Sequence, residues 1–244
     1  MFADSESSLR GTVTHSSLSR VLQHIAAANW PADMVAMTGD LIQDDSRAAY
    51  DRFCELMSTL NLPVYCVPGN HDVRDLMRDA VSQDPFHYCA SVHINNWLIT
   101  GIDSCIHDDA GGRVDDDELD RLAKILARTS AEHVLICLHH PPLPVGSKWL
   151  DQVGLKNGDE FLRMIAQPGN VRAAIFGHVH QAFEGNHASI KIIGTPSTCR
   201  QFMVENEGFA LDEHPPAYRR ISLHADGHLE HELIWLDPEG DQPQ

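Results

Sequence analysis

Six polar side chains stand shortly after four short apolar runs of this sequence. They comprise one carboxylate, one carboxamide and four imidazoles: Asp40, Asn70, His71, His139, His178 and His180. In an open parallel sheet, the carboxyl ends of the strands lie side by side and form the crevice that binds ligands. If the apolar runs are parallel strands, the six side chains therefore converge, although they are spread over 140 residues of sequence.

Imidazole nitrogens combined with carboxylate and amide oxygens form a ligand set for metal ions. Such mixed N/O ligands suit Mn, Fe, Zn or Co better than Mg or Ca. Two metal ions about 3.5–4 Å apart are the usual means of stabilising the attacking and leaving oxygens of a phosphoester. The set therefore predicts a metal-dependent hydrolase, whose cations would also attract a small anionic substrate.

Each motif also has a purely structural interpretation. A Gly-Asp pair after a strand is common in turns, the segment 69–72 could cap the next helix, and His139-His140 could be a hydrogen-bonded edge pair. His178 and His180 lie on one face if their segment is extended, because side chains alternate. All four motifs nevertheless occur together, each after an apolar run, and this combination favours the metal site.

The rest of the sequence predicts the elements that would position these residues. Apolar runs predict strands over 34–37, 64–67, 92–102 (one or two strands), 134–138 and 173–176. Apolar periodicity predicts helices over 18–25, 49–60 and 115–126, the first of them capped by Ser16 and Ser17. Segments 190–193 and 218–235 alternate and are expected to be antiparallel. The alternation of strands and helices indicates an α/β fold with a mainly parallel sheet.

The organisation of the chain favours one domain over residues 1–244, because no repeat, low-complexity segment or linker is present. Residues 203–217 are expected to form a long irregular loop. One expected element is missing: the first helix should follow a strand, yet residues 2–16 contain no apolar run able to form one. Either the domain begins with a helix, or its first strand is absent from this chain.

Composition and charge exclude several classes of protein. Hydrophobic residues make up 43% and charged residues 22%, which excludes disordered and fibrous chains. The formal net charge of −17 disfavours nucleic-acid polymers and anionic membranes as partners. There is no 18-residue apolar stretch and no secretion signal. The six cysteines include no Cys-x-x-Cys pair, so we expect free thiols and a cytoplasmic chain.

The four motifs together resemble those of the calcineurin-like metallophosphoesterases. They are Gly39-Asp40, Gly69-Asn70-His71-Asp72, His139-His140-Pro141-Pro142 and Gly177-His178-Val179-His180. Later segments resemble the bacterial class III 3',5'-cyclic-AMP phosphodiesterases: Thr195-Pro196-Ser197-Thr198-Cys199, Gln201-Phe202, Tyr218-Arg219 and Asp226-Gly227. The resemblance extends over nearly the whole chain.

The resemblance implies a fold of two facing mixed β-sheets flanked by helices, and it implies the ligands of two divalent metal ions. Asp40 would bridge the two ions. Asn70, His139 and His178 would complete one site, and His180 would belong to the other. The His139-His140 doublet leaves open which imidazole binds the metal, and the residue nearer the strand, His139, is favoured.

The resemblance also implies how the substrate is held. His71 would lie over the phosphate as the catalytic residue, and it would contact the substrate together with Asn70 and His180. Asp72 and His140 would support the ligands from behind.

The sequence departs from the family pattern at its beginning. The family opens with a strand that ends in Asp-x-His and supplies two ligands, but residues 1–30 contain no Asp-x-His. Phe2-Ala3-Asp4 resembles the residues that come directly after that motif in the family, so we expect a start placed too far downstream or a truncated chain. The chain would then keep one nearly complete metal site but only Asp40 and His180 of the other.

Three functions are compatible with these observations. The first is hydrolysis of 3',5'-cyclic AMP to 5'-AMP, in which hydroxide held between two metal ions attacks phosphorus and His71 assists departure of the ribose 3'-oxygen. The second is hydrolysis of another nucleotide or phosphodiester, with specificity expected around 197–217. The third is an inactive binding module with one metal. The sequence leaves open the identity of the metal and whether the chain forms a homodimer.

Overall fold

The structure is a computed structural model that describes residues 1–237. Its helices are α1 (Thr14–Ala27), α2 (Arg47–Ser58), α3 (Arg74–Ala80), α4 (Asp116–Arg128) and α5 (Gly158–Ala166). The longer strands are β3 (Val35–Met37), β4 (Val64–Cys66), β5 (Phe86–Tyr88), β6 (Ser91–Ile94), β7 (Trp97–Gly101), β8 (His133–Cys137), β9 (Val171–Phe176), β10 (Phe183–His187), β11 (Ile190–Gly194), β14 (Ala217–Leu223) and β15 (Leu229–Trp235). Two-residue strands form small hairpins: β1 (Ser8–Leu9) with β2 (Thr12–Val13), and β12 (Gln201–Phe202) with β13 (Leu211–Asp212).

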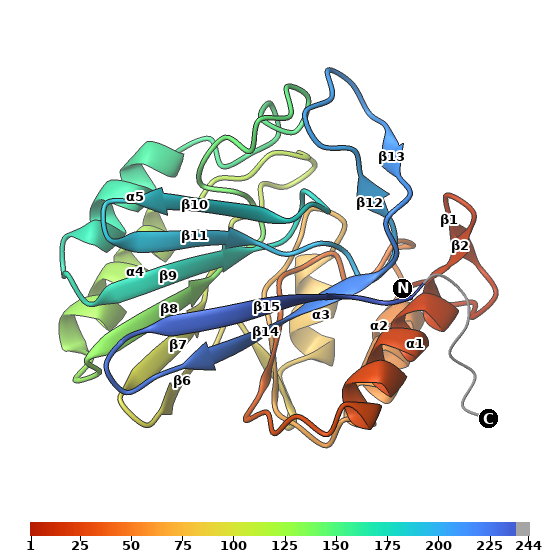
Figure 1. Ribbon diagram of the computed structural model, residues 1–244, viewed down its shortest axis with the longest axis horizontal. Helices are drawn as coiled ribbons and strands as arrows, with labels where there is room; N and C mark the ends of the chain where they lie inside the picture. The colour runs from red at the N-terminus through yellow and green to blue at the C-terminus, as the bar shows by residue number, and fades with distance from the viewer. Residues whose placement is uncertain (238–244) are drawn as a thin grey trace.

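The longer strands are arranged in two main sheets (Figure 1). Strands β3, β4 and β5 form a parallel sheet in that order. The larger sheet has the order β10-β11-β9-β8-β7-β6, in which the four central strands are parallel and the two edge strands are antiparallel to their neighbours. The antiparallel β14–β15 hairpin lies beside them. The parallel strands of both sheets end near the same edge, and the loops that follow them can therefore meet.

The alternation of side chains along the strands separates the apolar cores. On β8, Val134 and Ile136 pack with α4 and α5, whereas Leu135 and Cys137 belong to the core between the sheets. A further core packs α1, α2 and α3 against the three-stranded sheet. The resulting order of helix, sheet, sheet and helix confirms the predicted α/β fold of facing sheets flanked by helices.

Most predicted elements are present, with three differences. The predicted caps of α1 are wrong: the helix begins at Thr14 without a side-chain cap, and the Ser17 hydroxyl instead donates to the Thr198 carbonyl at 2.7 Å. Strand β11 is antiparallel to β10 but parallel to β9, so the antiparallel prediction for 190–193 is only half right. The expected irregular loop 203–217 contains β13. The single domain over 1–244 stays a prediction, and residues 238–244 lie outside the described part.

The space beside β3 bears on the predicted absence of a first strand. Within residues 1–237, β3 pairs only with β4, and β14 pairs only with β15. A largely apolar cavity of about 630 Å³ lies between β3 and β14, and it extends to Asp40 and His139. The absence of a first strand from this chain stays a prediction.

Two further expectations concern the location of the chain. In the part of the chain that the structure describes, none of the helices combines the length and the apolar character needed to span a membrane. All six cysteines are free thiols, as expected. The cytoplasmic location stays a prediction.

One side chain of α2 holds the loop after β4 in place. The Tyr50 hydroxyl donates to Asp72 Oδ1 at 3.0 Å and accepts a hydrogen bond from the Val73 N–H at 3.0 Å. Tyr50 is fully buried, so water cannot replace either partner without rearrangement.

We expect Tyr50→Phe to lower the free energy of unfolding by about 1–3 kcal/mol, because it keeps the ring but leaves the Val73 N–H without its acceptor and removes one donor from the Asp72 carboxylate. Urea unfolding monitored by circular dichroism measures the change. Tyr65→Phe is the matched control, since Tyr65 is half-buried, stacks on His87 and lies outside this contact. Equal effects of the two substitutions would contradict the assignment.

Candidate metal centre

The six residues singled out in the sequence lie at the carboxyl ends of four strands from both main sheets. Asp40 follows β3, and the segment 70–71 follows β4; both strands belong to the three-stranded sheet. His139 follows β8, and the segment 178–180 follows β9, in the six-stranded sheet. The two sheets therefore contribute to one site, as the parallel topology predicts.

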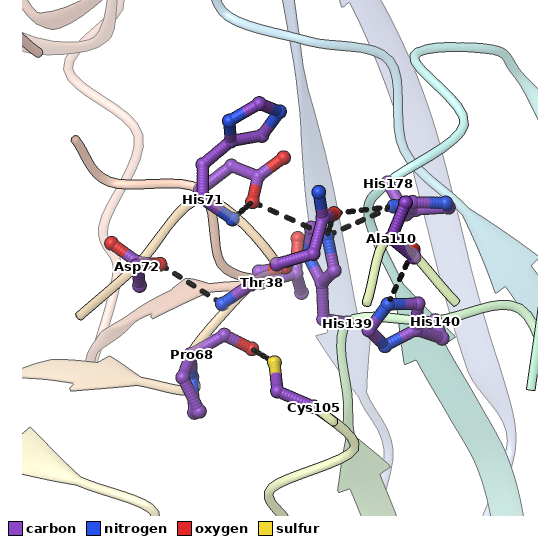
Figure 2. Close-up of polar contacts among 12 residues, drawn as sticks. Thr38, Pro68, His71, Asp72, Cys105, Ala110, His139, His140 and His178 are labelled. Carbon is purple, nitrogen blue, oxygen red and sulfur yellow. Dashed lines mark hydrogen bonds and ion pairs between the residues drawn. The ribbon is translucent and has the colours of Figure 1, made fainter. Parts of the chain in front are cut away.

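Four potential ligand atoms converge on one point of this site. The His178 Nδ1 atom lies 3.0 Å from Asn70 Oδ1 and 3.1 Å from His139 Nε2. His139 Nε2 lies 3.2 Å from Asn70 Oδ1 and 3.4 Å from Asp40 Oδ1. Figure 2 shows the rings of His139 and His178 approaching each other. This donor set of two imidazoles, one carboxamide and one carboxylate suits a transition-metal ion.

Backbone carbonyls fix the tautomers of two histidines. His139 Nδ1 lies 2.6 Å from the Thr38 carbonyl oxygen, and His180 Nδ1 lies 2.7 Å from that of Arg200. A carbonyl oxygen only accepts hydrogen bonds, so both Nδ1 atoms carry the proton. Each Nε2 atom is left with a lone pair, which is the usual arrangement of a metal-binding histidine.

His178 provides a test of whether a cation fits. Burial and the neighbouring His139 and His140 hold the pKa of His178 well below its usual value, so the ring is neutral. Its Nδ1 atom faces the His139 lone pair and the Asn70 amide group, and its buried Nε2 has no hydrogen-bond partner among residues 1–237. In the tautomer of His178 with the proton on Nε2, its Nδ1 lone pair faces His139 Nε2 and Asn70 Oδ1, and a cation shared by these acceptor atoms would offset their mutual repulsion. The residues therefore fit a metal ion.

Asp40 supplies the negative charge of the site. Burial raises the pKa of the Asp40 carboxyl, but the nearby imidazoles, that of His139 foremost, and the hydrogen bond from the His71 backbone outweigh it and hold the pKa well below its usual value. The backbone N–H of His71 also donates to Asp40 Oδ1 at 3.0 Å. Asp40 is thus a carboxylate at neutral pH, as metal coordination requires.

His140 differs from its neighbour, because both of its ring nitrogens have protein partners. Nδ1 lies 2.9 Å from the Ser104 hydroxyl, and Nε2 lies 3.3 Å from the Ala110 carbonyl (Figure 2). Burial and the adjacent His139 lower the pKa of His140 to about 3. Ligand atoms of His139, His140 and His178 lie within 4.8 Å of one another, but only His139 and His178 face the convergence point.

The partly buried carboxylate of Asp72 holds two of the loops together. It accepts hydrogen bonds from the N–H groups of Leu41 at 3.1 Å, Ile42 at 3.3 Å and Gly69 at 2.9 Å, in addition to the Tyr50 hydroxyl. Burial and the nearby Asp40 raise the pKa of Asp72 to about 6, against the effect of these donors. Asp72 therefore links the loop after β3 to the loop after β4.

The backbone around the site is closely packed. Asp40, His178 and His180 have φ angles of 58°, 63° and 48°, in the left-handed region that non-glycine residues rarely adopt. A β-carbon on Gly69 would lie 2.2 Å from Asp40 Oδ1, and one on Gly39 would lie 2.4 Å from His139 Nδ1. The loops after β3, β4 and β8 therefore approach one another only because two glycines separate them.

A cavity of about 220 Å³ opens beside these residues. The predicted residues that line it are Asp40, Asn70, His71, His178 and His180. His71 is exposed at this opening, whereas His139 is buried behind the ligand atoms.

The same cavity is lined by Arg10 and Trp149, which sequence reasoning missed, and by Phe202 and Phe209, which lie in the segment around 197–217 where specificity was expected. Phe202 stacks on His180 with ring centroids 4.2 Å apart. Phe202 belongs to the Gln201-Phe202 segment that carried the family resemblance, whereas Trp149 lies in a loop without periodicity and gave no signal.

Curated relatives match almost the whole chain. The 3',5'-cyclic adenosine monophosphate phosphodiesterases CpdA of Haemophilus influenzae and Escherichia coli K12 are each 35% identical, over 96% and 100% of this chain and 85% and 89% of the relative. The 3',5'-cyclic-nucleotide phosphodiesterase alr5338 of Nostoc is 31% identical, over 93% of this chain and 85% of the relative.

Solved structures share the fold. A dimetal phosphatase from Danio rerio superposes with a TM-score of 0.65 over 94% of this chain and 92% of its own, at 16% identity. The sequence model of the calcineurin-like phosphoesterases matches residues 12–182, which include all six convergent residues. With that match and the 35% identity of the curated relatives, the chain belongs to the calcineurin-like phosphoesterase family.

Proposed function

We propose that this chain hydrolyses 3',5'-cyclic AMP to 5'-AMP with the help of two divalent metal ions. The observation that carries the proposal is the convergence of Asp40, Asn70, His139 and His178 at one crevice, with ligand atoms 3.0–3.4 Å apart. The names of the relatives that match nearly the whole chain supply the substrate class.

The tautomers and contacts support an assignment of each ligand. Asn70 Oδ1, His139 Nε2 and His178 Nδ1 would hold one ion, and Asp40 would offer its carboxylate to both. His180 would serve the second site through Nε2, the ring nitrogen left free by the contact of Nδ1 with the Arg200 carbonyl. The ligand types favour Mn, Fe, Zn or Co.

The protein side chains then orient the phosphodiester and handle its protons. Metal ions bound at this centre would act as Lewis acids that neutralise charge on the phosphate. His71 contacts Asp40 through its backbone N–H, so its exposed imidazole is free to hold a proton at the leaving ribose 3'-oxygen. Asn70 and His180 line the same cavity and are assigned to substrate binding. Asp72 and His140 do not bind the metal or the substrate in this proposal, but their hydrogen bonds support the loops that carry the metal ligands.

The second candidate function is hydrolysis of a different cyclic nucleotide, because one relative carries the broader name 3',5'-cyclic-nucleotide phosphodiesterase. Turnover of cyclic AMP, cyclic GMP and a linear diester at equal concentration separates these possibilities. Whether the chain acts as a homodimer stays a prediction.

Removal of metal tests the centre directly. We expect EDTA to abolish turnover of cyclic AMP and Mn²⁺ or Fe²⁺ to restore it, whereas Mg²⁺ and Ca²⁺ restore it poorly. Elemental analysis should give two ions per active chain. A single ion together with no turnover would support the inactive binding module instead.

Replacement of His71 tests the proton-handling role. We expect His71→Ala to lower kcat by about 10²–10⁴-fold, the usual contribution of a general acid or base. The metal content should stay unchanged, because alanine keeps the backbone N–H that contacts Asp40. His187→Ala, at the far end of β10, serves as the control. An unchanged kcat in the His71 variant would exclude this role.

Replacement of Gly69 tests the close approach of the loops. In Gly69→Ala the new β-carbon would collide with the Asp40 carboxylate, so we expect loss of metal and at least a tenfold fall in kcat/KM. Gly154→Ala is the control, since its β-carbon would meet nothing closer than 3.5 Å. Wild-type metal content in both variants would contradict the geometry described here.

A further inference from the structure

We propose that Trp149, Phe202 and Phe209 form an aromatic subsite that binds the base of a purine nucleotide, with Arg10 covering it. The inference rests on the proposed function and deepens it, because it places the part of the substrate that the metal centre does not contact. We refer to these three rings as the aromatic subsite.

The rings of the aromatic subsite come from two segments far apart in the sequence, the loop around Trp149 and the β12–β13 hairpin that carries Phe202 and Phe209, and they meet edge to face. The centroids of Trp149 and Phe202 are 5.3 Å apart, those of Trp149 and Phe209 are 5.6 Å apart, and those of Phe202 and Phe209 are 5.4 Å apart. Phe202 also stacks on His180, with the two ring planes only 5° from parallel. The aromatic subsite is therefore continuous with the metal centre, and both line the cavity of about 220 Å³.

The aromatic subsite remains partly open to water, unlike a structural core. Phe209 is 46% exposed, and its loop also carries Met203 and Val204 at 43% and 54%. Among residues 1–237, these are three of the four large apolar side chains with substantial exposure, and the fourth is Trp30. Apolar surface concentrated beside a charged crevice is typical of a ligand site that has both an apolar and a polar end.

An unpaired donor also points to a ligand that carries an acceptor. Trp149 Nε1 is buried and has no hydrogen-bond partner within residues 1–237. A buried indole N–H normally finds an acceptor. The indole N–H lies in the plane of the Trp149 ring, and the rings of Phe202 and Phe209 meet Trp149 edge to face. A purine stacked on one of these phenylalanine rings, and not on the indole itself, can therefore direct an in-plane ring-nitrogen acceptor toward this donor.

Cationic residues hold the segments around the aromatic subsite. The Arg10 guanidinium, at the turn of the β1–β2 hairpin, lies 4.0 Å from the centroid of the Phe209 ring, which is a cation–π contact. Lys148, next to Trp149, forms an ion pair with Glu207 in the Phe209 loop. The hairpin and two loops thus converge over the cavity, and Arg10 places a positive charge near an anionic substrate despite the net charge of −17.

The chemistry of stacking defines the ligand class. Every base offers a π-face, so aromatic platforms bind bases with little selectivity, and larger ring systems stack over more area. The aromatic subsite is therefore expected to favour purine over pyrimidine nucleotides and to discriminate weakly between adenine and guanine.

The experiment compares cyclic AMP with methyl riboside 3',5'-cyclic phosphate, which keeps the sugar and the diester but lacks the base. We expect Phe209→Ala to raise KM for cyclic AMP by roughly 5- to 150-fold with kcat nearly unchanged, and to leave the baseless substrate unaffected. Phe209→Tyr should restore the wild-type KM. Met203→Ala is the control, because Met203 lies in the same exposed loop but does not line the cavity.

Binding of 5'-AMP to the metal-loaded chain, followed by quenching of tryptophan fluorescence, gives a readout that needs no turnover. Trp149→Phe should remove the quenching, and Phe209→Ala should weaken binding by a factor similar to its effect on KM. An unchanged 5'-AMP affinity in Phe209→Ala, or equal effects on both cyclic substrates, would overturn the aromatic subsite and leave the proposed reaction standing. Failure of the wild-type chain to hydrolyse either substrate would instead refute the proposed reaction.

Discussion

The geometry of the centre depends on one partly buried carboxylate, that of Asp72. It gathers N–H groups from two loops that belong to different strands, and the Tyr50 hydroxyl of α2 completes its set of donors. Asp40 and Asn70 sit on those loops, so their positions follow from this contact and not from their own side-chain preferences. Asp72 is not itself a proposed metal ligand, yet its hydrogen bonds determine where the potential ligands Asp40 and Asn70 lie.

The backbone also positions two other potential ligands, His139 and His180. Carbonyls of Thr38 and Arg200 orient the rings of His139 and His180. These acceptors lie at strand ends and short turns, where carbonyls are not used by the sheet. Asp40, His178 and His180 have left-handed φ angles. Strained backbone of this kind usually has a functional reason when it occurs at a site. Main-chain geometry thus positions the side chains of the centre before a metal ion or a substrate binds.

The sequence predicted what depends on periodicity and motif order. The strands that end at Asp40, His139 and His178 were identifiable because each is a continuous apolar run. The choice between His139 and His140 was not decidable, since it depends on a contact with Ser104, 36 residues away in the chain. Trp149 was missed for the same reason, because it meets Phe202 and Phe209 only when two segments far apart in the sequence fold over the crevice.

Because both sheets contribute residues to the centre, a bound metal ion would affect the stability of the folded protein. A cation bound by loops of the three-stranded and six-stranded sheets crosslinks two layers that otherwise adhere mainly through apolar packing. Any ion that binds only the folded chain stabilises it by mass action, to an extent set by free metal concentration. Metal supply would then govern how long the chain survives proteolysis, as well as how fast it works.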